Sequence, residues 1–366
     1  PLAPLIAALF TAIPCNCLND RKYKFAWWTM FFGFGISLFL LWQTIQNPEP
    51  IKILLFTTSW KVLPVVELSI SRLSAVMMAV VSGYGTLLYR YSTRYLQQDK
   101  RLSYFQTIFA LKISFQMLML GSSDLLTLFI CWQLINWLLG LLSHNFAHVP
   151  TAQGAFRTFI MLRFGDLAFL LGIVLAYYLY GTIQFTQLFE RAALDQTLFP
   201  LFGTGIEIPG VTIVTLLIFI GAMSKSAQFP FHMWLPDALY APTPIHALLH
   251  AGGINAGGFL LAFLAPLFIL SPITLHIVLV IGLVTAILGS SMMLVQNDIK
   301  KALGYSTIGQ MGYMIMECGL GAFSLAVFHL IAHGLFKADI FLNCGKGIHE
   351  ARLDPKQPSQ PSQESS

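Results

Sequence analysis

The chain has 366 residues, of which 56% are hydrophobic and 10% are charged, and its mean hydropathy is +0.70. Soluble domains carry about 25% charged residues, so this composition excludes an ordinary soluble protein and indicates a polytopic membrane protein. The formal net charge is +5, but the basic residues concentrate in loops between apolar runs and give no reason to expect nucleic-acid binding.

A series of apolar runs follows along the chain, and a run of about 20 residues is long enough to cross a bilayer as a helix. The fold class is therefore an all-α polytopic membrane protein. Residues 51–64 are expected to form a short interfacial element, residues 1–348 the transmembrane domain and residues 349–366 a disordered polar tail. We predict eleven spans, at about 2–18, 25–45, 67–89, 102–121, 124–142, 157–180, 211–231, 243–268, 273–295, 300–320 and 324–346.

The distribution of lysine and arginine between the loops predicts the orientation, because basic residues concentrate on the cytoplasmic side. Lys52, Lys61 and Arg191 lie on one side of the predicted spans. Thirteen lie on the other side: Arg21, Lys22, Lys24, Arg90, Arg94, Lys100, Arg101, Arg157, Lys300, Lys301, Lys346, Arg352 and Lys356. The C-terminal tail is then cytoplasmic and, across an odd number of spans, the N-terminus is outside.

The remaining basic residues fall within or at the edges of predicted spans: Arg72, Lys112, Arg163, Lys225 and Lys337. A charge at the bilayer centre costs about 3 kcal/mol on insertion scales, so each of these residues is a functional candidate. Lys112 in the fourth span and Glu317 in the tenth are isolated candidates. Arg163 and Asp166 lie three residues apart in the sixth span. They form either a neutral structural clamp or a counter-charge for Lys225.

Lys225 lies deep in the seventh span, just before Gln228, Pro230 and Pro236. Proline interrupts helical hydrogen bonding, and broken helices within a membrane line cavities or ion sites. A buried lysine also loses its proton more readily than one in water. We therefore predict a broken helix with Lys225 as a proton carrier. The alternative is a lysine that extends to the membrane surface from a helix end.

Histidines follow in the eighth and eleventh spans. His246 and His250 are four residues apart and share a helix face. A metal is the alternative to a proton relay there, but no third ligand is evident, so we predict no metal site. In the eleventh span His329, His333 and Lys337 form a polar stripe at spacings of four. Imidazole titrates near neutral pH, so both sets favour a proton relay.

Several long motifs resemble one known family. They are MSKSAQFPFHMWLPDALYAPTPIHALLHAG (223–252), NDIKKALGYSTIGQMGYM (297–314), FHLIAHGLFKADIFL (328–342) and RFGD (163–166). They are similar to the antiporter-like, proton-conducting membrane subunits of respiratory complex I and Mrp-type antiporters. The resemblance implies that fold. It also implies an ion path through the central lysine Lys225, the eighth-span histidine His250 and the eleventh-span residues His329, His333 and Lys337.

Within that superfamily, HAGGINAGGFLL (250–261) and the short chain resemble the DabB membrane subunits of bacterial inorganic-carbon accumulation complexes. The resemblance implies an inner-membrane subunit that passes protons or sodium down their gradient. This flow would drive CO2 hydration or bicarbonate accumulation by a large soluble DabA-like partner. The partner would hold a carbonic-anhydrase-like zinc, so no cofactor is expected in this chain.

Two departures from the family pattern bear on this hypothesis. The family usually has a glutamate in the fifth span as a partner of the central lysine, and here CWQLINW (131–137) places Gln133 there. The chain also ends after the eleventh span, so the usual exit residue of a twelfth span is not part of it. Asp166 could replace the acid, or the ion path could differ.

Two other functions remain open. One is a subunit of a complex I-like or Mrp-type antiporter, and the other is a membrane anchor that conducts no ions and only holds a catalytic partner. The intramembrane lysines and histidines argue against a pure anchor, which gains nothing from their insertion cost. No nucleophile, nucleotide-binding loop or redox motif is evident, so we do not expect this chain to be an enzyme by itself.

Overall fold

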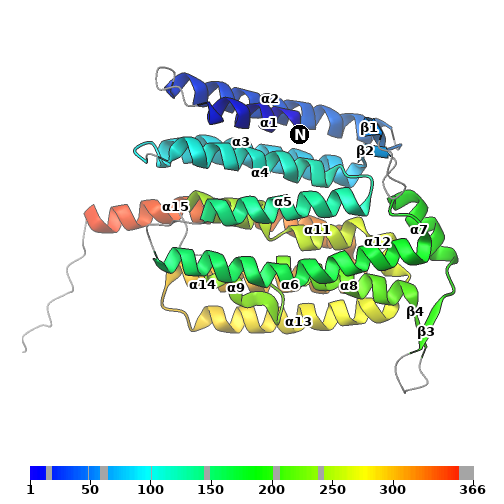
Figure 1. Cartoon of the computed structure of the whole chain (residues 1–366). Coiled ribbons are helices and arrows are strands. Elements are labelled where there is room, and N and C mark those ends of the chain that lie inside the picture. Colours follow the sequence, from blue (N-terminus) through cyan, green and yellow to red (C-terminus); the bar gives the residue numbers. More distant parts are fainter. Residues whose placement is uncertain are drawn as a thin grey trace, which may run out of the picture.

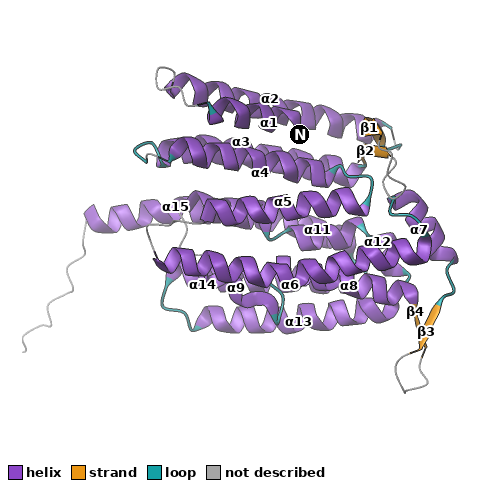
Figure 2. Cartoon of the chain, in the orientation of Figure 1, coloured by secondary structure: helices purple, strands orange, loops and turns teal. Residues whose placement is uncertain are grey.

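The computed structural model describes residues 1–13, 19–47, 49–57, 65–99, 101–143, 149–200, 207–237 and 243–353. Most of these residues are helical, and the long helices run side by side across the molecule (Figures 1 and 2). Buried apolar side chains between them form one continuous core that reaches from α1 to α15.

Helices of the N-terminal half are α1 (Leu2–Ala12), α2 (Asn19–Gln46), α3 (Arg72–Tyr95), α4 (Leu102–Leu120), α5 (Leu125–Ser143), α6 (Val149–Tyr180) and α7 (Phe185–Leu194). The C-terminal half contains α8 (Gly210–Lys225), η2 (Phe231–Met233), α9 (Trp234–Asp237), α10 (Thr243–Leu248), the π-helical turn η4 (Leu249–Gly253), α11 (Ala256–Phe263) and α12 (Ala265–Ile269). Three long helices complete it, α13 (Pro272–Leu294), α14 (Ile299–Gly319) and α15 (Phe323–Leu353).

Helical segments occupy each of the predicted ranges. In the described part of the chain, six helices are long and apolar enough to cross a membrane by length and composition, at Arg21–Gln46, Leu125–Ser143, Phe156–Tyr180, Pro244–Phe263, Pro272–Leu294 and Phe323–Asn343. Two shorter apolar helices, α1 and α8, accompany them. The protein is thus a helical membrane protein, and the number of eleven crossings stays a prediction.

A β-hairpin stands where the short interfacial element was predicted. Strands β1 (Ile51–Thr57) and β2 (Val65–Ile70) pair antiparallel, and the residues between them lie outside the described part. β2 includes the first residues of the predicted third span, so α3 begins only at Arg72. The β-branched residues of β2 favour a strand. The Ser71 side chain accepts a hydrogen bond from the Ser74 amide and so caps α3.

Two regions contain helix or strand that was not predicted. Helix α15 continues to Leu353, so the boundary predicted at residue 348 falls inside a helix, and residues 354–366 lie outside the described part. The short helix α7 and the paired strands β3 (Leu198–Pro200) and β4 (Glu207–Pro209) were not predicted. Ten residues are too few for a span, and α7 buries only one face, with Phe185, Leu188 and Ala192.

The two ends of the bundle carry different elements (Figure 1). The β-hairpin, α7 and the β3–β4 pair lie at one end, together with Lys52 and Arg191. The end of α3, the start of α4, the α13–α14 connection and the C-terminal end of α15 lie at the other. This second end contains the described members of the larger basic set, including Arg90, Arg94 and Lys301.

Candidate functional site

The predicted break in the seventh span is present. Helix α8 ends at Lys225, and Ala227 has a φ of 48°, a left-handed conformation that non-glycine residues rarely adopt. Side chains satisfy the carbonyl groups that the break frees. The Trp234 indole donates to the Ser224 carbonyl at 2.8 Å, and the Gln228 amide donates to the Ser226 carbonyl at 2.9 Å. The break is therefore a hydrogen-bonded structure that holds Lys225 inside the protein.

Lys225 is 2% exposed and contacts helix α5. Its ammonium group donates to Asn136 Oδ1 and lies 5.2 Å from the centre of the Trp132 ring. Close packing of α8 on α6 supports this position, because a Cβ on Gly221 would lie 2.7 Å from the Phe169 Cβ. Lys225 is thus a buried lysine at a helix break, and it does not extend to the membrane surface.

Asp166 on α6 is the carboxylate of this region. Its Oδ1 accepts a hydrogen bond from Trp132 Nε1 at 2.8 Å, and its Oδ2 accepts one from Asn136 Nδ2 at 3.2 Å. Arg163 pairs with the same carboxylate at 2.8 Å. Asn136 therefore links Lys225 to the Asp166–Arg163 pair, and we call Trp132, Gln133, Asn136, Arg163, Asp166 and Lys225 the central cluster.

Gln133 has a different partner from the one that its position in the family motif implies. Its Oε1 accepts a hydrogen bond from Arg163, while Lys225 donates to Asn136, one helical turn further along α5. Asp166 and Lys225 share Asn136 as a hydrogen-bond partner. The negative charge near the lysine thus comes from α6.

Lys112 connects the central cluster to the eighth span. It is fully buried on α4, which packs against helix α5 of the central cluster. Its ammonium donates to Gln116 Oε1 at 3.1 Å, and the Gln116 amide donates to the Gly252 carbonyl at 3.0 Å. Because Gly252 belongs to η4, Lys112 lies between the two broken helices and is not an isolated charge.

The second break carries His250. In η4 the Ile254 amide donates to the Leu249 carbonyl at 3.0 Å, an i→i+5 bond of the π type that often occurs at functional sites. His246 and His250 are both fully buried, and their rings stack on Phe341 of α15 at 5.6 and 4.5 Å. Neither ring nitrogen of His250 has a hydrogen-bond partner among the described residues.

The stripe on α15 faces α14 and the second break. His329 lies between Glu317 and Gln310, at 3.1 and 3.0 Å, so Glu317 is not isolated. The Lys337 ammonium donates to Ser306 at 2.9 Å. His333 is 6% exposed, and its ring lies 6.2 Å from that of His329.

Helix α15 packs against η4, and the His250 ring stacks on Phe341 of α15, so the stripe and the second break form one group. We call His246, His250, Glu317, His329, His333 and Lys337 the histidine cluster. In the described ranges, no three His, Cys, Asp or Glu side chains converge in a way that could hold a metal ion.

Other polar residues of this region were not singled out in the sequence. Asn136, Gln116, Ser306 and Gln310 are uncharged and carry no distinctive spacing; only their position inside predicted spans marks them. Arg72, by contrast, donates to the Thr44 carbonyl at 3.1 Å near the β-hairpin, where it joins two helix ends and neither cluster.

Two models of known protein families match the chain. The family model described as "NADH:quinone oxidoreductase/Mrp antiporter, TM" matches residues 122–357, which include both clusters but not Lys112 and its helix α4. The chain belongs to this antiporter-like family. A second model, "NADH-Ubiquinone oxidoreductase (complex I), chain 5 N-terminus", matches residues 64–106.

Two relatives illustrate the range of the family. The "Probable inorganic carbon transporter subunit DabB1" of Halothiobacillus neapolitanus is 47% identical over 81% of this chain and 52% of its own length. The chloroplastic "NAD(P)H-quinone oxidoreductase subunit 5" of Vicia faba is 35% identical over 95% of this chain and 47% of its own length. The chain thus spans about half the length of these relatives, so its short length does not separate a DabB-like branch from the others.

Solved structures confirm the antiporter-like fold. The Mrp complex from Dietzia sp. DQ12-45-1b contains a chain that matches with a TM-score of 0.83 and 26% identity, over 96% of this chain and 38% of that one. A chain of the archaeal membrane-bound sulfane sulfur reductase matches in fold, with a TM-score of 0.80 over 94% of this chain and 69% of that one. These neighbours are parts of multi-subunit membrane complexes.

Proposed function

We propose that this chain conducts protons across the bacterial inner membrane and couples that flow to inorganic-carbon uptake by a partner subunit. One observation carries the proposal. Five titratable side chains, which we call the row, are buried inside the bundle: Lys112, Lys225, His250, His333 and Lys337. Two of the segments that carry them are broken helices. Intramembrane ionisable residues that face the interior of a bundle are typical of proton relays.

The residues of the row favour protons over sodium. Lysine and histidine nitrogens bind and release protons, whereas sodium prefers oxygen ligands such as the carbonyls of unwound helices. The five buried members Lys112, Lys225, His250, His333 and Lys337 all carry nitrogen. Sodium remains the second candidate ion, because the helix breaks also leave backbone carbonyls within the membrane.

The inorganic-carbon partner is proposed from the relationship to the DabB1 subunit, at 47% identity. The name of that relative describes an inorganic carbon transporter subunit. The partner that we propose is a large soluble DabA-like protein, which would hold the zinc ion. The proposed orientation has the C-terminal end of α15 in the cytoplasm, because basic residues gather at that end of the bundle.

A second candidate is a subunit of a cation/proton antiporter or a quinone-reducing complex. The Mrp chain with a TM-score of 0.83 and the chloroplastic relative at 35% identity favour it. The same ion path would serve either machine. Only the partner subunits separate the two proposals.

Two measurements test the proposal. The first is co-purification from the native membrane with mass spectrometry: a large zinc-binding partner supports carbon uptake, and quinone-enzyme subunits contradict it in favour of the second candidate. The second is ion flux in proteoliposomes that contain the purified complex, under imposed proton or sodium gradients. Proton flux supports a relay, sodium flux alone contradicts it, and no flux in either gradient identifies an anchor that conducts no ions.

A further inference from the structure

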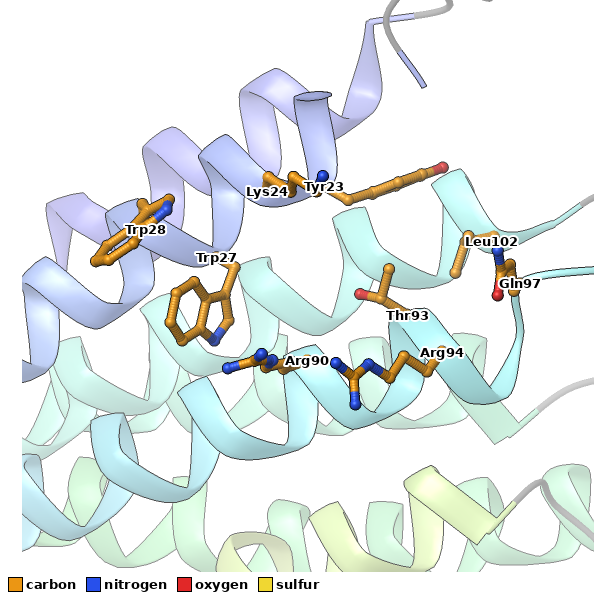
Figure 3. Close-up of a pocket in the computed structure, with 9 residues that line it drawn as sticks. All are labelled: Tyr23, Lys24, Trp27, Trp28, Arg90, Thr93, Arg94, Gln97 and Leu102. Atoms are coloured by element: carbon orange, nitrogen blue, oxygen red, sulfur yellow. The ribbon is translucent and has the colours of Figure 1, made fainter. Parts of the chain in front are cut away.

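A basic cavity lies at the end of the bundle, where α2 begins and α3 ends (Figure 3). Its volume is about 600 Å³, within the range of about 300–1,000 Å³ usual for ligand sites. Seven side chains that line it come from these two helices: Tyr23, Lys24, Trp27, Trp28, Arg90, Thr93 and Arg94. The cavity is far from both clusters in the sequence and shares no residue with them.

The positive charge of this cavity has no ionic counterpart among the described side chains. No described carboxylate lines the cavity. The ion pairs among the described residues are Arg101–Asp99, Arg163–Asp166 and His329–Glu317, and none of them includes Lys24, Arg90 or Arg94. Three cations around a concave surface therefore attract an anion from outside the chain.

Aromatic side chains arrange these donors. The Arg90 guanidinium lies 5.0 Å from the centre of the Trp27 ring, a cation–π contact that holds it beside the cavity. The Trp27 indole nitrogen is buried without a hydrogen-bond partner among the described residues, and it is turned toward Arg90 (Figure 3). Buried polar groups normally have a partner, and this N–H lacks one beside the cavity.

An apolar surface continues from the cavity toward the middle of the membrane. Phe31 lies one turn beyond Trp27, is 46% exposed and stacks on the Trp27 ring at 5.6 Å. Leu87 lies one turn before Arg90 and is 70% exposed. Both side chains therefore belong to an outer surface that lipid chains can cover.

We propose that this cavity binds the phosphate group of an anionic phospholipid whose acyl chains lie along α2 and α3. Basic pockets between membrane helices bind anionic headgroups, and tryptophan and tyrosine concentrate at the level of the headgroups. A free phosphate ion shares the headgroup chemistry but gains nothing from Phe31 and Leu87. The combination of cations, an unpartnered indole N–H and an adjoining apolar surface therefore favours a lipid.

Native mass spectrometry of the purified complex tests this proposal. The protein is exchanged into phosphatidylglycerol or phosphatidylcholine, and the lipid retained per complex is counted. We expect preferential retention of phosphatidylglycerol, reduced roughly fivefold by Arg94→Gln and further by Arg90→Gln/Arg94→Gln, as expected from the loss of one or two surface cations. Lys301→Gln removes an exposed charge at the same end outside the cavity and is the matched control.

Two further measurements keep the test decisive. Arg94→Lys preserves the charge and should restore retention, which a folding defect would not allow. Inorganic phosphate at millimolar concentration should not displace the retained phosphatidylglycerol. Equal losses in Arg94→Gln and Lys301→Gln, or complete displacement by phosphate, would overturn the proposal in favour of general surface charge or a free-anion site.

Discussion

The central cluster and the histidine cluster are both buried and polar, and each has unpartnered atoms, among them Gln133 Nε2 and Arg163 Nε in the central cluster, but they differ in how Lys225 and His250 are bonded. In the central cluster, Asp166 accepts hydrogen bonds from Trp132 and Asn136 and pairs with Arg163, while Lys225 donates to Asn136. In the histidine cluster, both ring nitrogens of His250 and Nε2 of His333 have no partner among the described residues.

This difference indicates that the two clusters have different roles in ion transport. A bonded network with a carboxylate holds charge in one place, because the Asp166 carboxylate has Arg163 as a fixed counter-ion and Trp132 and Asn136 as fixed donors. An unsatisfied buried polar group costs about 1–3 kcal/mol of folding free energy. His250 and His333 therefore destabilise the fold unless water molecules or transferred protons bind their ring nitrogens. We infer that the central cluster controls the charge of Lys225 and that the histidine cluster transfers protons.

The largest expected effect comes from removal of the central carrier. Lys225→Ala should reduce gradient-driven uptake by at least about 100-fold, because a positioned proton-transfer group contributes about 10²–10⁴-fold. The complex should remain assembled, because the substitution also removes a costly buried charge. Uptake by membrane vesicles measures the first effect and co-purification the second. Wild-type uptake by this variant would exclude a relay through Lys225.

A smaller loss is expected in the histidine cluster. His333→Ala should reduce proton flux about 10- to 100-fold, since it removes one of several relay groups. Leu335→Ala is the control, because Leu335 is of similar size on the same helix and 51% exposed. Flux in proteoliposomes should change less than twofold in the control. Similar losses in both variants would indicate a packing effect and remove the distinction between the clusters.

Removal of the Asp166 carboxylate tests whether the central cluster holds charge in place. Asp166→Asn leaves Arg163 and Lys225 without a carboxylate, and we expect a loss of about 1–3 kcal/mol in stability because buried partners lose a charged acceptor. Thermal unfolding in detergent measures this loss, and flux should fall about 10-fold. Asp339→Asn is a matched control, because Asp339 is exposed and accepts a hydrogen bond from its helix neighbour Asn343. Unchanged stability in Asp166→Asn would contradict a structural network around Lys225.

The smallest effect is expected for Gln133→Glu. Because Gln133 bonds Arg163, the new carboxylate should pair with that arginine. Asp166 would then be neutralised less by Arg163 and would stabilise the protonated form of Lys225 more strongly. Turnover should fall a few-fold near neutral pH, and the pH optimum should move upward. Uptake against pH for wild type and variant measures the shift. Superimposable profiles would mean that Gln133 has no influence on Lys225.

Several features of the site followed from residue types alone. Lys225 beside Gln228 and Pro230 predicted a broken helix, because proline cannot continue helical hydrogen bonding. The spacing of His329, His333 and Lys337 predicted a stripe on one helix face, which the structure contains. The hairpin β1–β2 was missed, because an apolar run of strand residues next to a helix has no distinct periodicity.

The sequence by itself determined that this is a helical membrane protein with intramembrane lysines and histidines. Composition and the length of apolar runs are local properties, and they depend on the lipid solvent more than on packing. Only the tertiary structure decided which of these groups meet. Asn136 became the partner of Lys225, Glu317 the partner of His329, and Lys112 the link between two helix breaks. The bonds of Lys225 to Asn136 and of Gln116 to Gly252 join helices far apart in the sequence. The rotation of each helix about its axis is set by packing against its neighbours.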